Sequence, residues 1–252
     1  MRRVFPIFIF LAFVGAFLPG QQLRIAAYNT GGLGETRTDY QALARLLSNF
    51  DLVAAVQVMN AEGLEKVVTA LDERWEGVMS EKENRARGLR EFFGFIFNDR
   101  VELVKMLGAY PPPDTFIRPP YGAQFKLRGS RFAFNLVACH ITQSAARSTE
   151  IFRLADVYRY FEKLTGNRGI TILAGDFNDD KPRSFDSFLG GTDRQVVAVR
   201  GTMSGRRGAD PGFDHMFASA ALQPRIEAAD LFSGGEPGAR RLPVYLVLKA
   251  GR

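Results

Sequence analysis

Short apolar runs of β-type composition alternate with segments of helical period along most of the chain, and this alternation constrains the fold more than any other feature. The β-type runs lie at residues 23–28, 52–58, 92–97, 101–107, 122–127, 132–139, 170–174, 213–218 and 244–248. The segments with a helical period lie at residues 40–47, 62–71 and 149–164. Strands and helices interleaved in this way predict a layered α/β domain.

Two pairs of neighbouring runs predict β-hairpins. The runs that flank Asn98 and Asp99 form one pair, and the runs that flank Gly129 and Ser130 form the other. Hairpins of this kind build antiparallel sheet, whereas the continuously apolar run at 170–174 is typical of a strand buried on both faces. We therefore expect an α/β fold of two packed, mostly antiparallel β-sheets flanked by helices.

The first 20 residues have the three parts of a secretory signal. Arg2 and Arg3 stand near the start, an uncharged apolar run covers 4–18, and Pro19 and Gly20 follow it. We expect cleavage of residues 1–20 and a secreted or periplasmic protein. Because the apolar run is shorter than the ~20 residues that cross a bilayer, a membrane anchor is the second interpretation.

The rest of the chain, residues 21–252, has the length of one compact domain, and we expect a monomer without a stable membrane span. Basic residues exceed acidic ones by 33 − 27 = 6, or by 31 − 27 = 4 without Arg2 and Arg3. This excess suits an anionic partner such as nucleic acid. The single cysteine, Cys139, excludes an intrachain disulfide and a zinc ribbon. We interpret it as a buried structural thiol, not a nucleophile.

The segment Gly-Asp-Phe-Asn-Asp-Asp follows the buried strand directly and contains Asp176 and Asn178. A carboxylate and an amide two residues apart at a strand end can hold a hard cation through one oxygen and a phosphate or its attacking water through the other. The alternative is a turn closed by the aspartate side chain, combined with helix capping.

Three further polar residues stand at strand ends. Asn29 closes the first strand, His140 closes the strand at 132–139, and Asp214 opens the strand at 213–218. A lone histidine is more often structural than catalytic, and His215, on the opposite face from Asp214, is interpreted as structural. The order and spacing of the four strand ends is the stronger signal.

In that order and spacing the chain resembles the endonuclease/exonuclease/phosphatase superfamily, and within it the secreted deoxyribonuclease-like branch. The resemblance covers residues 23–248 and implies a four-layer sandwich that hydrolyses phosphodiesters with Mg²⁺, or with Mn²⁺ or Ca²⁺. It also implies roles for further residues by their context, Arg118 as a phosphate ligand and Glu91 as the acid that orients His140. The implied site comprises His140, Asp176, Asn178 and Glu91 as catalytic residues, Asn29 and Arg118 as phosphate ligands, and Gln57, Asp214 and Asp176 at the metal-ligand positions. By their charge, Arg240 and Arg241 are expected as further phosphate ligands.

The chain departs from the family pattern at three of these positions. Gln57 stands where the family has the glutamate that is its principal magnesium ligand, and Arg240 and Arg241 stand where the family has an aspartate and a histidine before the last strand. These exchanges add +1, +2 and +1 formal charges. At ~5 Å and an effective dielectric of ~20 each unit charge changes the energy of a cation by about 3 kcal/mol. The site is therefore expected to bind metal weakly and to hold anions well.

Two functional hypotheses follow. The first is a secreted, metal-dependent phosphodiesterase, most simply a nuclease, with weak activity. The alternative is a catalytically impaired homologue that binds nucleic acid or a phosphorylated ligand through Arg118, Arg240 and Arg241. A lipid or sugar-phosphate phosphatase or a sphingomyelinase of the same superfamily is a third possibility, because a fold does not determine a substrate.

Overall fold

The computed structural model describes residues 22–81, 84–86, 89–111, 115–199, 213–233 and 242–249. The predicted signal at 1–20 lies outside these ranges, as do Arg240 and Arg241. No helix within them is long and apolar enough to cross a membrane.

The described chain consists of thirteen strands, four α-helices and two short 3₁₀ helices. The strands are β1 (Gln22–Leu33), β2 (Leu52–Val58), β3 (Trp75–Met79), β4 (Asn84–Ala86), β5 (Leu89–Asn98), β6 (Val101–Ala109), β7 (Tyr121–Leu127), β8 (Ala133–His140), β9 (Thr171–Asp176), β10 (Val196–Ala198), β11 (Asp214–Ser219), β12 (Ile226–Leu231) and β13 (Val244–Lys249). The helices are α1 (Tyr40–Leu47), α2 (Ala61–Leu71), α3 (Arg147–Leu164) and α4 (Asp186–Gly191), with 3₁₀ turns at Pro182–Phe185 and Ala220–Arg225.

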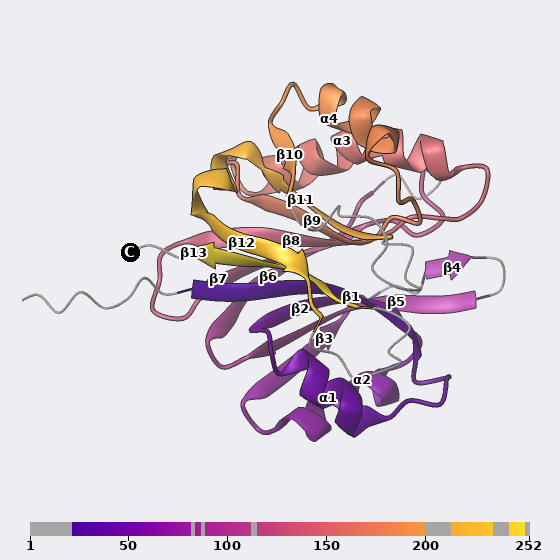
Figure 1. Ribbon diagram of the computed structural model, residues 1–252, viewed down its shortest axis with the longest axis vertical. Coiled ribbons are helices and arrows are strands. Elements are labelled where there is room, and N and C mark those ends of the chain that lie inside the picture. Colours follow the sequence, from indigo (N-terminus) through magenta and orange to yellow (C-terminus); the bar gives the residue numbers. More distant parts are fainter. Residues whose placement is uncertain are drawn as a thin grey trace, which may run out of the picture.

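The strands form two sheets that pack face to face. One sheet has the order β12-β13-β1-β2-β5-β3, with β4 paired to β5, and the other has the order β10-β11-β9-β8-β7-β6. Helices α1 and α2 lie on the outside of the first sheet and α3 and α4 on the outside of the second (Figure 1). The predicted sandwich of two sheets flanked by helices is confirmed, with four layers.

The helices outside the first sheet begin at polar caps. The side chain of Asp39 accepts a hydrogen bond from Ala42 N at the start of α1, and that of Asn60 accepts one from Gly63 N at the start of α2. Each cap satisfies a backbone donor that has no partner inside its helix. The boundaries predicted from periodicity therefore agree closely with the observed ones.

One of the two predicted hairpins is wrong. β7 and β8 do pair antiparallel across the turn at Gly129 and Ser130. β5 and β6, however, belong to different sheets, because β5 pairs with β2 and β3 while β6 pairs with β7. The turn after Asn98 thus carries the chain from one sheet to the other. Both sheets also contain a parallel pair, β1 with β2 and β8 with β9.

Strand alternation divides the core into three clusters. Residues such as Ala27, Phe95, Ala138 and Ala174 face the space between the sheets, where they form the largest cluster. Their neighbours along each strand face the helices instead and form the two outer clusters. The face of the sheet on which a residue at a strand end lies can therefore be inferred from the core residues of the same strand, because side chains alternate between the two faces.

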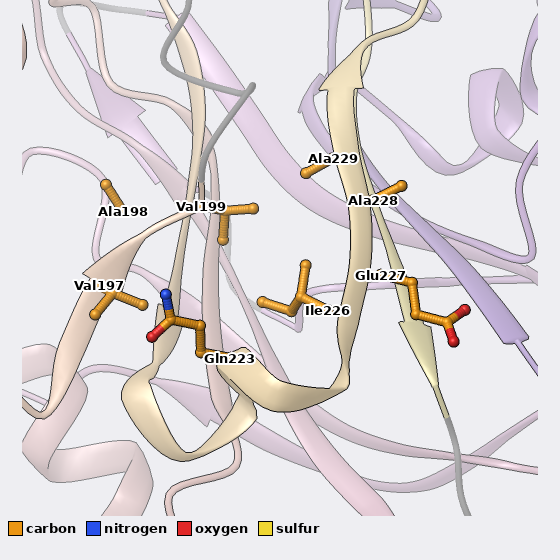
Figure 2. A pocket seen from close by; sticks show the side chains of 8 residues that line it. All are labelled: Val197, Ala198, Val199, Gln223, Ile226, Glu227, Ala228 and Ala229. Atoms are coloured by element: carbon orange, nitrogen blue, oxygen red, sulfur yellow. The ribbon is translucent and has the colours of Figure 1, made fainter.

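A groove of about 330 Å³ opens between the edge strands β10 and β12 of the two sheets (Figure 2). Its walls are mostly aliphatic, with Val197 and Val199 on one side and Ile226 and Ala229 on the other. None of the residues singled out in the sequence lines it. The candidate site residues lie instead at the strand ends.

Candidate active site

Three of the predicted site residues lie side by side at the ends of adjacent strands. His140 of β8 is the register partner of Asp176 of β9, and Asp176 is in turn the register partner of Asp214 of β11. All three continue the rows of residues that face the other sheet, such as Ala138 and Ala174. The same alternation that builds the core thus directs these side chains into the space between the sheets.

Asp176 connects the two sheets through a hydrogen bond. Its Oδ2 accepts from Nδ2 of Asn29, at the end of the buried part of β1, over 2.7 Å, and its Oδ1 accepts from the backbone N of Asn178 over 2.8 Å. Asn29 is fully buried and Asp176 is 1% exposed. The Oδ1 of Asn29 accepts from Gly31 N. Because both of its oxygens are engaged, the Asp176 carboxylate is held in one orientation.

A second group joins His140 to Glu91 and Arg118. Nδ1 of His140 lies 2.8 Å from Oε1 of Glu91, and Nε of Arg118 lies 2.6 Å from the same oxygen. A carboxylate with a guanidinium beside it accepts, so Nδ1 carries the hydrogen and Nε2 is left for a ligand. Glu91 and His140 are buried, and the side chain of Arg118 is 11% exposed. The structure thus brings Glu91 into contact with His140, the pair to which the resemblance assigns these roles.

Asn178 stands just past the end of β9 in a left-handed backbone conformation, with φ of 50°. Its Nδ2 donates to Ile141 O, and its Oδ1 accepts from Nε2 of Gln143. The backbone bond from Asn178 N to the Asp176 side chain is the aspartate-closed turn that was the alternative interpretation of this motif. The two interpretations of the motif are therefore compatible, because the turn orients the side chains of Asp176 and Asn178.

Gln57 lies at a β-bulge of β2, where the pairing with β5 shifts between Ala55 and Val58. Its φ of 59° is again left-handed, which is costly for a residue that is neither glycine nor asparagine. Its carbonyl oxygen accepts from Oγ1 of Thr30, which ties the bulge to the strand that carries Asn29. Bulges commonly redirect a side chain beside an active site.

His215 faces away from this cluster, as the alternation predicts. It is 1% exposed and packs among Phe177, Phe185 and Phe217 on the helix side of the sheet. Its Nε2 lies 2.6 Å from Asp179 O, and since a carbonyl only accepts, this nitrogen donates. His215 thus supports the loop after Asp176 from beneath.

Three polar residues that reach the site were missed in the sequence. Gln143 bonds to Asn178 as described, and Nη1 of Arg147 donates to Asn178 O over 2.8 Å. Glu150 accepts from two loop backbones and is 1% exposed. Glu150 alone left a signal, because it falls on the apolar stripe of α3, where a charged residue is unusual.

The residues at the strand ends fit a divalent cation to a limited extent. The carboxylates of Asp176 and Asp214 stand on neighbouring strands, and two buried like charges are stabilised by a cation between or beside them. Mg²⁺ is commonly held by one or two carboxylates, with water and substrate oxygens completing its shell. Within the described residues no group of three or more His, Cys, Asp or Glu side chains has metal-binding geometry. The site thus suits a shared, open metal position better than a closed cage.

Comparisons with known proteins agree with this fold. No protein-family model matches the chain. A curated protein named deoxyribonuclease, from Thioalkalivibrio sp. (strain K90mix), is 31% identical over 188 residues, which cover 70% of this chain and 51% of the relative. The chain thus spans about half the length of that relative.

Two solved structures from Bacteroides thetaiotaomicron are similar in fold. One is an endonuclease/exonuclease/phosphatase family protein (TM-score 0.66, 16% identity, 90% of this chain and 95% of the other), and the other is a mannosyl-6-phosphatase (TM-score 0.64, 17% identity, 89% and 98%). At such identities the structures establish the fold alone. The chain thus has an endonuclease/exonuclease/phosphatase-type fold, and the sequence similarity to a curated deoxyribonuclease supports its assignment to the deoxyribonuclease-like branch of that superfamily.

Proposed function

We propose that this protein is an exported phosphodiester hydrolase of the nuclease type that uses a divalent cation with reduced efficiency. The observation that carries the proposal is the junction of two hydrogen-bonded pairs, Glu91 with His140 and Asn29 with Asp176. His140 and Asp176 are register partners on adjacent strands, so the two pairs meet across one strand spacing. His140, which can transfer a proton, and the carboxylate of Asp176 can therefore act on the same phosphate.

Several donors around Asp176 suit a phosphate oxygen. Among the described residues, Asn29 and Asn178 each donate one amide hydrogen, toward Asp176 and Ile141, so the second hydrogen of each amide is a candidate donor to a ligand. Nη1 of Arg118 is buried without a hydrogen-bond partner among the described residues. Donors fixed in advance at a buried site stabilise an anion without reorganising when it binds or reacts.

His140 is suited to stabilise the negative charge that develops on the phosphoryl and leaving-group oxygens. With Nδ1 donating to Glu91, Nε2 can hold or deliver a proton at an oxygen of the substrate. Glu91 fixes the orientation of the ring, and Arg118 on the same carboxylate places a positive charge beside it. When bound by Asp176 and Asp214, a divalent cation would supply charge neutralisation and an activated water.

Two observations favour reduced activity, and they support the second candidate, a homologue that binds a phosphorylated ligand without turnover. Gln57 offers a neutral oxygen where the family pattern has a carboxylate, and Arg240 and Arg241 replace an acid and a histidine in the sequence. The known relatives do not decide the substrate, because one is named deoxyribonuclease and another mannosyl-6-phosphatase.

The test is a cleavage assay on the purified chain with plasmid DNA, RNA, bis(p-nitrophenyl) phosphate and a sugar monophosphate, each with Mg²⁺, Mn²⁺, Ca²⁺ or chelator. We expect slow nicking of DNA that chelator abolishes and that Asp176→Asn lowers at least 100-fold. Asp156→Asn, at an exposed ion pair on α3, is the matched control and should leave the rate unchanged. Binding that persists in chelator without cleavage would favour the second candidate, and cleavage confined to the monophosphate would overturn the nuclease proposal.

Export is tested separately. We propose that residues 1–20 are removed, so amino-terminal sequencing of protein recovered outside the cytoplasm should begin near Gln21. A chain that still begins at Met1 and sediments with membranes would support the anchor interpretation instead.

A further inference from the structure

Helix α3 carries two buried glutamates, one near each end. Glu150 lies in the first turn and Glu162 in the last, with exposures of 1% and 4%. Each accepts two backbone N–H groups from loops outside the helix. Burying a carboxylate costs free energy unless it is paired or hydrogen-bonded, and in both glutamates the backbone N–H groups offset this cost.

The two loops that Glu150 holds are those that carry Arg118 and His140. Oε1 of Glu150 accepts from Ile117 N over 2.8 Å, and Oε2 accepts from Thr142 N, also over 2.8 Å. Ile117 directly precedes Arg118, and Thr142 is two residues past His140. One carboxylate therefore bridges two backbone segments that are otherwise separate in the chain.

This bridge complements the one made by Glu91. Glu91 joins the side chains of Arg118 and His140 at one oxygen, whereas Glu150 joins the backbones from which those side chains extend. Burial raises the pKa of the Glu150 carboxyl, and the hydrogen bonds from Ile117 N and Thr142 N, followed by the nearby Arg118 and His140, partly offset that rise.

We propose that Glu150 is a positioning residue, which fixes the spacing between Arg118 and His140 by anchoring their two loops to the start of α3. The proposal rests on the proposed function only in taking Arg118 and His140 as parts of the site. A carboxylate is needed because both of its oxygens must accept. The amide of glutamine has the same shape but one oxygen, so it can accept only one N–H and turns its own NH₂ toward the other.

Glu162 offers a matched control on the same helix. It accepts from Gly169 N and Ile170 N, and also from Ser219 Oγ over 3.2 Å. It thus anchors the entry to β9, about 18 Å along the helix from Glu150 at 1.5 Å per residue. Glu162→Gln leaves the same kind of buried mismatch as Glu150→Gln, but far from Arg118 and His140. A purely structural role for Glu150 predicts equal consequences for the two variants.

The experiment compares Glu150→Gln and Glu162→Gln in the full mature chain by three readouts. The first is the nitrogen-15 spectrum of the two histidine rings, in which His215 serves as an internal reference. The second is the affinity for inorganic phosphate, and the third is the cleavage rate. Denaturant midpoints should fall in both variants. Only Glu150→Gln should move the His140 signals, weaken phosphate binding about tenfold or more and lower cleavage, because misplacement by an ångström can cost up to about 100-fold.

Equal effects of the two variants on the His140 signals and on phosphate affinity would overturn the proposal. If Glu150→Gln does not fold, Glu150→Asp and Glu162→Asp repeat the comparison, since aspartate keeps both acceptor oxygens but has a shorter reach. If the wild-type chain neither cleaves nor binds phosphate, the proposed function fails, while the His140 spectrum still decides whether Glu150 positions the loop.

Discussion

Replacing Glu91 by glutamine tests whether the buried group around His140 is held by charge. Glu91 is 2% exposed, and its Oε1 serves both His140 and Arg118. With charge centres about 4 Å apart and an effective dielectric near 20, the attraction between Glu91 and Arg118 is about 4 kcal/mol. Removing one partner also leaves the guanidinium buried and unpaired, and such losses cost about 3–5 kcal/mol. A domain stable by about 5–15 kcal/mol should remain folded, but with much less margin.

The assay is urea unfolding of Glu91→Gln, Arg118→Gln and the double variant, extrapolated to water. We expect each single change to lower the free energy of unfolding by about 3 kcal/mol or more, and the double variant to lose less than their sum, because no charge is left unpaired. Glu62→Gln is the control. It breaks an exposed pair with Lys66 at 2.5 Å and should have no measurable effect. A loss below about 1 kcal/mol for Glu91→Gln, or strict additivity, would refute the reasoning.

Three further predictions concern other parts of the site. Gly175→Ala should cost about 3 kcal/mol or more in urea unfolding, because its φ of 145° disfavours other residues and a Cβ would overlap the carbonyl of Cys139; a change below 1 kcal/mol would contradict this. Burial raises the pKa of the Cys139 thiol, so an aromatic disulfide reagent at pH 8 should label it only in denaturant, and rapid native labelling would be inconsistent with the packing. Restoring Gln57→Glu, Arg240→Asp and Arg241→His together should raise metal-dependent cleavage about 100-fold or more, whereas single reversions should change it little; an unchanged rate in the triple variant would show that these positions do not limit the reaction.

The strands of the core could be predicted from sequence because each is buried on at least one face and therefore has a strong apolar pattern. The strands that were missed are short or lie at sheet edges, such as β3, β10 and β12, where half-exposed positions blur the period. The incorrect hairpin has a different cause. A turn after Asn98 is a local signal, but the sheet that the next strand joins is decided by long-range pairing.

The site was predictable to the extent that its residues follow apolar strands directly. Asn29, His140, Asp176 and Asp214 all stand at such ends, and alternation already indicates that they face inward. The supporting contacts were not predictable in the same way. Gln143 is an ordinary loop residue in sequence, and its role depends on a left-handed turn 35 positions away in the chain. Such partners are set by loop conformation, which periodicity does not describe.

The hydrogen bond between Asn29 and Asp176 also determines at which stage of synthesis the candidate site can form. It joins residues 147 positions apart, and β1, which carries Asn29, takes β13 as one of its two neighbours, near the end of the chain. A growing chain that has emerged from the ribosome only as far as β8 has Asn29, Glu91 and His140 but lacks the carboxylates of β9 and β11. For a chain proposed to cut nucleic acid, this order of synthesis delays the chemistry until nearly the whole polypeptide exists, and contacts so distant in sequence form slowly. On the proposed function, a nascent chain that ends before β9 should not cleave, because the carboxylates of β9 and β11 are both still missing.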